Sequence, residues 1–351
     1  MLARAHRENL TESQDLPAAD SADGKTDRGQ VMKSIRNYGL YGLLEIAVPI
    51  ICTGVLSAQV RQAPLPPGET PAALCSTLRE GYTNFAQCHS ATQAQMCAMA
   101  QLAREDQTQA HRFDAIMGES DPDKAIRLVD DFAGTYPNSS LLSYAYFFAA
   151  SAYQQKGSIE QIAEYAGKSL KLDPDNLMSL ILSVEVLPQP QYIKKHTSDR
   201  ANILRQAQNE ADRALQLIPQ VLKLSQESDA DYQKRLAAVA SEIHGALGTV
   251  HMELASGRPG GLDKAELAKA EQEFQIAVST TRYPDPRDYY RLGEAYGVEG
   301  KLDDAIQAFT KAGKLGQDTA IKAYASEQIA QLKKRKAQDL AASNRAAASG
   351  H

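Results

Sequence analysis

If the apolar stretch that contains Cys52 is removed as a signal peptide, three cysteines remain in the chain: Cys75, Cys88 and Cys97. In an oxidising compartment such thiols form disulfides. Because three is an odd number, at most one internal pair forms, and Cys75 with Cys88 is the better candidate because a turn would bring these two together. Covalent haem attachment is excluded by spacing, since Cys88-His89 has no cysteine three residues earlier.

Two pairs of residues that include histidine have spacings that could support chemistry. His244 and His251 are seven residues apart and would share one face of a helix, but the nearby sequence offers no third metal ligand, so we expect them to pack. His111 and Asp114 would meet on one face as a surface pair.

The known catalytic and phosphate-binding motifs are missing from the sequence. The glycine-rich segment "GRPGGLDKA", residues 257–265, lacks the Gly-Lys-Ser/Thr ending of a phosphate-binding loop. Neither a nucleophile elbow, nor a metalloprotease helix, nor a nucleotide fingerprint occurs elsewhere. We therefore predict that the protein is not an enzyme and has no catalytic residue, metal site or cofactor.

The composition is that of a folded, helical protein. Of 351 residues, 43% are apolar and 23% charged, which is ordinary for a globular chain. Aromatic residues make up only 6% and tryptophan is absent, which favours an all-helical fold. The formal net charge of −5 produces no basic field that would attract nucleic acid. The local basic run at 333–336 fits the last turn of a helix.

Residues 32–58 have the pattern of a signal peptide. Lys33 and Arg36 precede an apolar core from 46 to 56, and Leu56-Ser57-Ala58 supplies small residues for cleavage. The alternative is a signal anchor, because residues 43–60 are just long enough to span a membrane. Both alternatives place the rest of the chain outside the cytoplasm, in the periplasm or secreted, or anchored to the inner membrane. Membrane contact is expected only if the signal is retained.

Residues 1–31 form a polar leader that is unusually long for an exported protein. One alternative is that translation begins at Met32, which would leave a conventional signal. Residues 59–73, "QVRQAPLPPGETPAA", read as an extended, proline-rich linker. Residues 74–105 are predicted to form an N-terminal helical segment that carries the three cysteines.

The remainder of the chain shows a repeating pattern of small and bulky residues. In "YYRLGEAYGVEGKLDDAIQAF", residues 289–309, the pattern consists of Tyr289, Leu292, Gly293, Tyr296, Gly300, Ala305 and Phe309. A segment of 34 residues, 143–176, has matching residues at Tyr146, Ala149, Ala150, Tyr153, Gly157, Leu170 and Pro174. There Ile162 and Ala166 replace the usual alanine and aromatic pair, and Tyr165 supplies the missing bulk from the next position.

This pattern resembles the tetratricopeptide repeat, whose units are antiparallel helix pairs. Weaker copies occur at 125–137, 207–219 and 247–277. The resemblance implies an all-α solenoid of about five helix pairs over residues 106–341, in which 319–341 form a capping helix and 342–351 a disordered tail. Gly293 is then explained, because a side chain there would push the paired helix away. The irregular intervals imply insertions in the third and fourth units.

In the family, the first helix of each pair lines a concave groove. Mapped onto this chain, the groove positions are Phe147, Phe148, Ser151, Gln154, Ile181, Leu182, Glu185, Tyr290, Arg291 and Glu294. Family members that clamp a terminal carboxylate use Asn and Lys there, and this chain has neither. The apolar residues 147, 148, 181 and 182 would form one exposed patch, which suits an amphipathic segment. The alternative is that Phe147 and Phe148 pack under residues 74–105.

The leading hypothesis is an exported, non-enzymatic scaffold that binds a protein or peptide in this groove. A second hypothesis is a structural subunit that self-associates or belongs to a cell-envelope assembly. A third is an envelope enzyme whose catalytic residues lie in the insertions at 188–200 and 255–265, although neither supplies a nucleophile together with a base. The identity of the partner is not encoded in any motif.

Overall fold

The computed structural model describes residues 106–221, 223, 227–256, 261–316 and 320–349, all of which belong to one compact unit. The leader, the signal, the linker, the N-terminal segment and the candidate disulfide between Cys75 and Cys88 lie outside the described residues.

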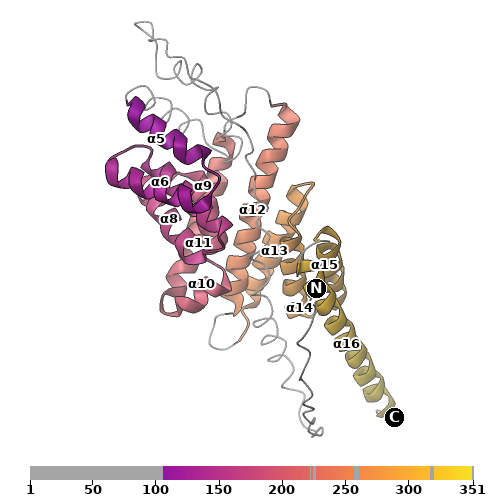
Figure 1. Cartoon of the computed structure of the whole chain (residues 1–351). Coiled ribbons are helices and arrows are strands. Elements are labelled where there is room, and N and C mark those ends of the chain that lie inside the picture. The colour runs from indigo at the N-terminus through magenta and orange to yellow at the C-terminus, as the bar shows by residue number, and fades with distance from the viewer. Residues whose placement is uncertain (1–105, 222, 224–226, 257–260, 317–319, 350–351) are drawn as a thin grey trace, which may run out of the picture. The chain divides into compact units, whose positions relative to one another are not determined.

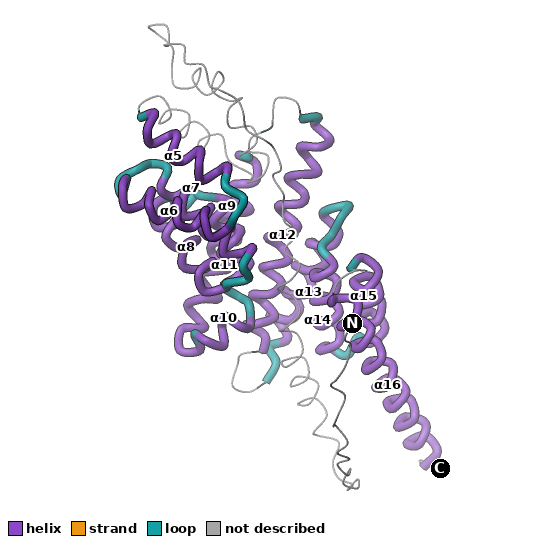
Figure 2. Tube along the Cα trace, viewed as in Figure 1, coloured by secondary structure: helices purple, strands orange, loops and turns teal. Residues whose placement is uncertain are grey.

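The described part of the chain is all-α, as predicted, and contains no strands (Figure 2). Its α-helices are α5 (Gln107–Gly118), α6 (Pro122–Thr135), α7 (Leu142–Gln155), α8 (Ile159–Leu172), α9 (Leu177–Val186), α10 (Pro190–Lys195), α11 (Arg200–Leu217), α12 (Asp229–Ser256), α13 (Lys264–Thr280), α14 (Pro286–Glu299), α15 (Leu302–Leu315) and α16 (Ala320–Ser349). Among them, none is long and apolar enough to span a membrane.

Aspartate caps and glycine stops define several helix ends. The Asp121 carboxylate accepts hydrogen bonds from the backbone of Asp123 and Lys124 at 2.9 and 3.1 Å, and Pro122 occupies the first turn of α6. A carboxylate at this position satisfies amide groups that have no partner within the helix. Gly300 ends α14 with a φ of +86°, a left-handed conformation that favours glycine.

The helices form pairs, and the pairs form two layers. The pairs are α5 with α6, α7 with α8, α9 with α11, α12 with α13, and α14 with α15, which correspond to the five expected units. The first helices also contact one another from unit to unit, in the order α5, α7, α9, α12, α14, and then α16 (Figure 1). We call this continuous row of first helices the inner layer.

Glycine allows the helices of two pairs to approach closely. A Cβ atom on Gly293 would lie 3.0 Å from the ring of Phe309, and one on Gly248 would lie 2.5 Å from the ring of Phe274. Both rings are buried between their own helix and the glycine-bearing helix. The explanation for Gly293 is therefore confirmed, and the fourth unit repeats it.

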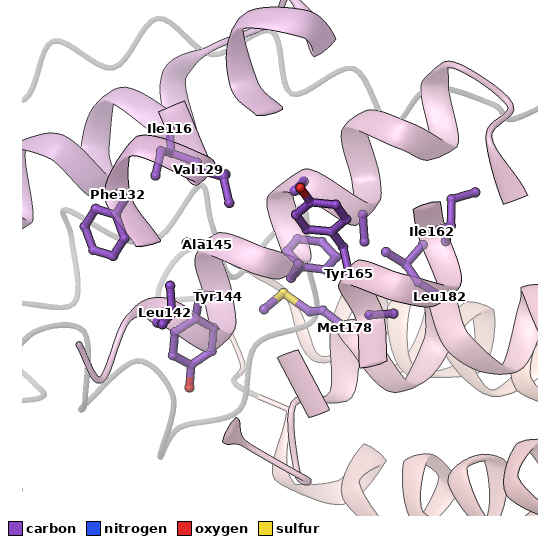
Figure 3. Close-up of a cluster of buried hydrophobic side chains, with 14 of the residues drawn as sticks. Ile116, Val129, Phe132, Leu142, Tyr144, Ala145, Ile162, Tyr165, Met178 and Leu182 are labelled. Carbon is purple, nitrogen blue, oxygen red and sulfur yellow. The ribbon is translucent and has the colours of Figure 1, made fainter. Parts of the chain in front are cut away.

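The second unit packs without such a glycine. Tyr165 of α8 contacts Tyr153 and Tyr146 of α7, with ring centroids 5.3 and 6.0 Å apart. It supplies the bulk that Ala166 lacks, as predicted. The surrounding core joins α5 to α9 and includes Phe132, Tyr144 and Met178 (Figure 3).

Insertions lengthen the third and fourth units. The short helix α10 and a 3₁₀ turn at Thr197–Asp199 separate α9 from α11, and α12 continues for 28 residues. The prediction of a disordered tail from residue 342 is wrong as far as Ser349, because α16 continues to that residue. The alanine-rich sequence after residue 340 has a high intrinsic helix propensity, which explains the extension.

Candidate functional site

The predicted apolar patch is not exposed. Phe147 is only 5% exposed and Leu182 6%, and both belong to the core that joins α5 to α9. Ile181 is buried in a different cluster, between α9, α11 and α12. The prediction of one exposed patch is therefore wrong. Spacing within a repeat does not show that neighbouring first helices contact each other and cover these side chains.

Phe148 also packs within the inner layer. Its ring makes edge contacts with Phe113 of α5 at 5.9 Å and with Phe147 at 5.3 Å. The alternative that we considered, packing under residues 74–105, concerns residues outside those described. Within the described residues, Phe148 is a half-buried part of the core.

Phe148→Ala is therefore expected to destabilise the fold, by about 2–4 kcal/mol, since a half-buried aromatic ring loses somewhat less than a fully buried one. Thermal melts of the variant and the parent measure the effect. An unchanged melting temperature together with weakened partner binding would instead support an exposed role for this ring.

Tyr290 is a core residue as well. It is 3% exposed, and its ring lies 5.0 Å from that of Phe309 at an edge-on angle of 68°. Its hydroxyl hydrogen-bonds to Gln328 of α16, so the capping helix covers it. Tyr290 is thus unavailable to a ligand, and the groove positions that remain are polar.

The polar positions of the second and third units meet. The Gln154 amide of α7 donates a hydrogen bond to Glu185 of α9 at 3.2 Å, and Ser151 lies half-buried one turn earlier. This contact runs along the inner layer from one unit to the next. The assignment of these residues to a binding groove stays a prediction.

Charged side chains of α9, α12 and α14 continue the polar positions along the inner layer. It contains the predicted residues Glu185, Arg291 and Glu294, and four residues that the sequence analysis missed, Glu242, Asp285, Arg287 and Asp288. We call the five carboxyl groups among them the acidic face: Glu185, Glu242, Asp285, Asp288 and Glu294. One signal in the sequence was Gly245, where a Cβ atom would lie 2.4 Å from Asp288 Oδ1.

Several carboxyl groups of the acidic face hold protons more tightly than usual. Burial raises the pKa of Asp288 to about 7, and nearby Asp285 adds to this. Burial likewise raises the pKa of Glu294 to about 7, against the attraction of Arg291. The pKa of Glu242 is raised because protein surrounds the carboxyl group and because Glu185 is adjacent. Glu242 is nevertheless an exposed residue.

These shifts predict a pH-dependent stability. Between about pH 4 and 7 the folded state retains protons on Asp288 that the unfolded chain releases, so the free energy of unfolding falls as pH rises. Asp288→Asn should remove this contribution and make the protein more stable than the parent at about pH 8, by about 2–4 kcal/mol. Denaturant titrations of the parent and the variant at several pH values measure the free energy of unfolding. Asp212→Asn on the exposed face of α11 is the control, and equal curves for both variants would contradict the assignment.

The two histidines of α12 pair with glutamates rather than with each other. His251 Nδ1 lies 2.7 Å from Glu266 Oε2, and His244 Nδ1 lies 2.7 Å from Glu273 Oε2. Both glutamates belong to α13. Among the described residues, no three histidine, cysteine or acidic side chains converge to hold a metal ion.

Comparison with known families agrees with this architecture. Residues 143–176, which contain α8 and all but the first residue of α7, match the family model of the tetratricopeptide repeat. No curated protein matches the chain. The match and the paired helices support a protein of the tetratricopeptide repeat family. Such repeats generally mediate protein–protein interactions, and the match therefore suggests an interaction scaffold.

Proposed function

We propose that the chain is an exported, non-enzymatic scaffold that binds another protein or a peptide through the inner layer. The observation that carries the proposal is the continuous contact of the first helices from α5 to α14, which aligns the polar side chains of successive units. Gln154 and Glu185 already meet there, and the acidic face follows. A row of this kind can contact an extended segment at several points along its length.

Site-specific photo-crosslinking tests the binding surface. A photoreactive amino acid replaces Ser151 on α7 or, in the matched variant, Asp212 on α11, the second helix of its unit. The variants are expressed in the native host and irradiated. We expect a cross-linked partner from position 151 and none from position 212.

Two outcomes would contradict the proposal. One is equal cross-linking from both positions, which would mean that the inner layer has no special role. The other is a cross-link only to a second copy of the chain, which would favour the self-associating structural subunit instead.

The proposal also includes export, because Lys33 and Arg36 precede an apolar core that ends in small residues. We expect cleavage after Ala58, so that the mature protein begins at Gln59. N-terminal sequencing of the protein purified from its native host measures this directly. Recovery of the intact leader from a soluble cytoplasmic fraction would contradict export.

A further inference from the structure

Acidic groups outnumber basic groups on and around the acidic face. Its five carboxyl groups come from α9, α12 and α14, and the guanidinium groups among them are those of Arg287 and Arg291. The three helices belong to successive units and contact one another in the inner layer. The carboxyl groups therefore lie along one surface.

The two arginines already have partners, one within the acidic face and one outside it. Arg287 Nε donates a hydrogen bond to Asp285 Oδ2 at 2.7 Å, and Arg291 donates one to the Thr249 hydroxyl. Within the described residues, neither arginine donates a hydrogen bond to Glu242, Asp288 or Glu294. Four carboxyl groups thus lack a cationic hydrogen-bond partner.

Asp288 is the most unusual of the four. The residue is 6% exposed, and among the described residues no donor hydrogen-bonds to its carboxylate. It faces the charged groups of Glu185, Arg287 and Arg291 and is held against the Gly245 backbone. The Asp288 oxygens are not among the described atoms that are both fully enclosed and without a hydrogen bond, so an approaching donor can reach them.

Glu185 and Glu242 provide a second indication. Burial and the adjacent Glu185 raise the pKa of the Glu242 carboxyl group. Glu242 is open to solvent, so an incoming cation can reach this pair and displace a proton.

We propose that the acidic face binds a lysine or arginine side chain of a protein partner. The proposal rests on the proposed function, since it names the chemistry that the inner layer would recognise. The carboxyl groups of the face are complementary to a basic side chain, whose long stem can carry the cation to them. A metal ion fits less well, because no three suitable ligands converge among the described residues.

Binding of a basic side chain should release protons. A nearby positive charge favours the ionised form of a carboxyl group, so protons held by Glu242, Asp288 and Glu294 near neutral pH would leave when the cation arrives. Simple surface attraction between a negative protein and a positive peptide would not release them.

Isothermal titration calorimetry of the mature chain tests the proposal. The probes are a capped peptide of alternating alanine and lysine, its alanine–glutamate counterpart, and spermidine. Each titration is repeated in buffers of different ionisation enthalpy to count the protons released. We expect the lysine peptide to bind with proton release, the glutamate peptide not to bind, and spermidine to bind more weakly than the lysine peptide.

Two variants of equal charge change complete the test. Glu242→Gln should weaken binding of the lysine peptide about tenfold or more, because a charge-assisted hydrogen bond is lost. Asp212→Asn, exposed on α11, should leave the affinity unchanged. Melting curves establish that both variants fold. If Glu242→Gln does not fold, Asp288→Asn replaces it and is judged by the same proton count.

Equal affinity of the two variants, or binding without proton release, would overturn the proposal. So would spermidine binding as tightly as the peptide, which would indicate a polyamine site. These results differ from a failure of the proposed function. If a partner cross-links at position 151 and its affinity is unaffected by Glu242→Gln, the scaffold function stands and only the acidic-face proposal fails.

Discussion

Phe274→Ala is expected to lower the free energy of unfolding by about 3–5 kcal/mol, the range for removing a fully buried aromatic ring. Phe274 has no exposed surface and fills the space between α12 and α13 beside Gly248. The neighbouring core, which includes Leu267 and Leu292, cannot close such a space without moving a helix. The loss should therefore approach the upper end of the range.

Equilibrium unfolding in denaturant measures this loss. Tyr283→Ala is the matched control, because Tyr283 is 78% exposed and its truncation should change stability by less than about 0.5 kcal/mol. Similar effects of the two substitutions would show that α12 and α13 are not paired through Phe274.

Gly293→Leu is the second substitution with a large expected effect, a loss of about 1–3 kcal/mol from overpacking. A Cβ atom at this position already lies 3.0 Å from three atoms of the Phe309 ring, and the rest of a leucine side chain must displace that ring. Phe309 is itself 2% exposed and packs against Tyr290, so the ring has little space into which it can move.

The control for Gly293→Leu lies one turn further along the same helix. A Cβ atom on Gly297 would meet only Leu332, at an ordinary 3.9 Å. Gly297→Ala should therefore leave stability unchanged or raise it by up to about 1 kcal/mol through helix propensity. Thermal melts of Gly293→Leu, Gly297→Ala and the parent measure the difference. Equal melting temperatures for the parent and Gly293→Leu would mean that α14 does not pack against α15 as described.

The pairing of helices could be predicted from sequence because it depends on residues close together in the chain. Gly293 and Phe309, or Tyr153 and Tyr165, lie within one unit, and their spacing directly reflects the contact between its two helices. The structure shows the same kind of contact between Gly248 and Phe274, within the weaker copy at 247–277.

Contacts between units were harder to predict. Phe147, Leu182 and Tyr290 occupy the expected positions on first helices, yet neighbouring helices cover them. The repeat pattern states which helix a residue belongs to, but the angle between successive units decides whether its side chain is exposed. The third and fourth units carry insertions, so no regular angle could be assumed.

Glu185 and Glu294 were predicted groove positions, but the rest of the acidic face was missed for the same reason. Glu185, Glu242 and Asp288 come from three units and are separated by many tens of residues, and Glu242 and Asp288 look like ordinary surface acids in their own segments. Only stacking of α9, α12 and α14 brings them together. Gly245 was the local signal, since a second glycine near Gly248 has no role in pairing α12 with α13.

The most direct test of the account is amide hydrogen exchange of the mature chain with and without the partner that cross-links at position 151. If the inner layer is the binding surface, the partner should slow exchange in α7, α9, α12 and α14, with the largest effect around Glu242 and Asp288. Slowed exchange confined to the second helices α8, α11 and α13 would contradict binding at the inner layer.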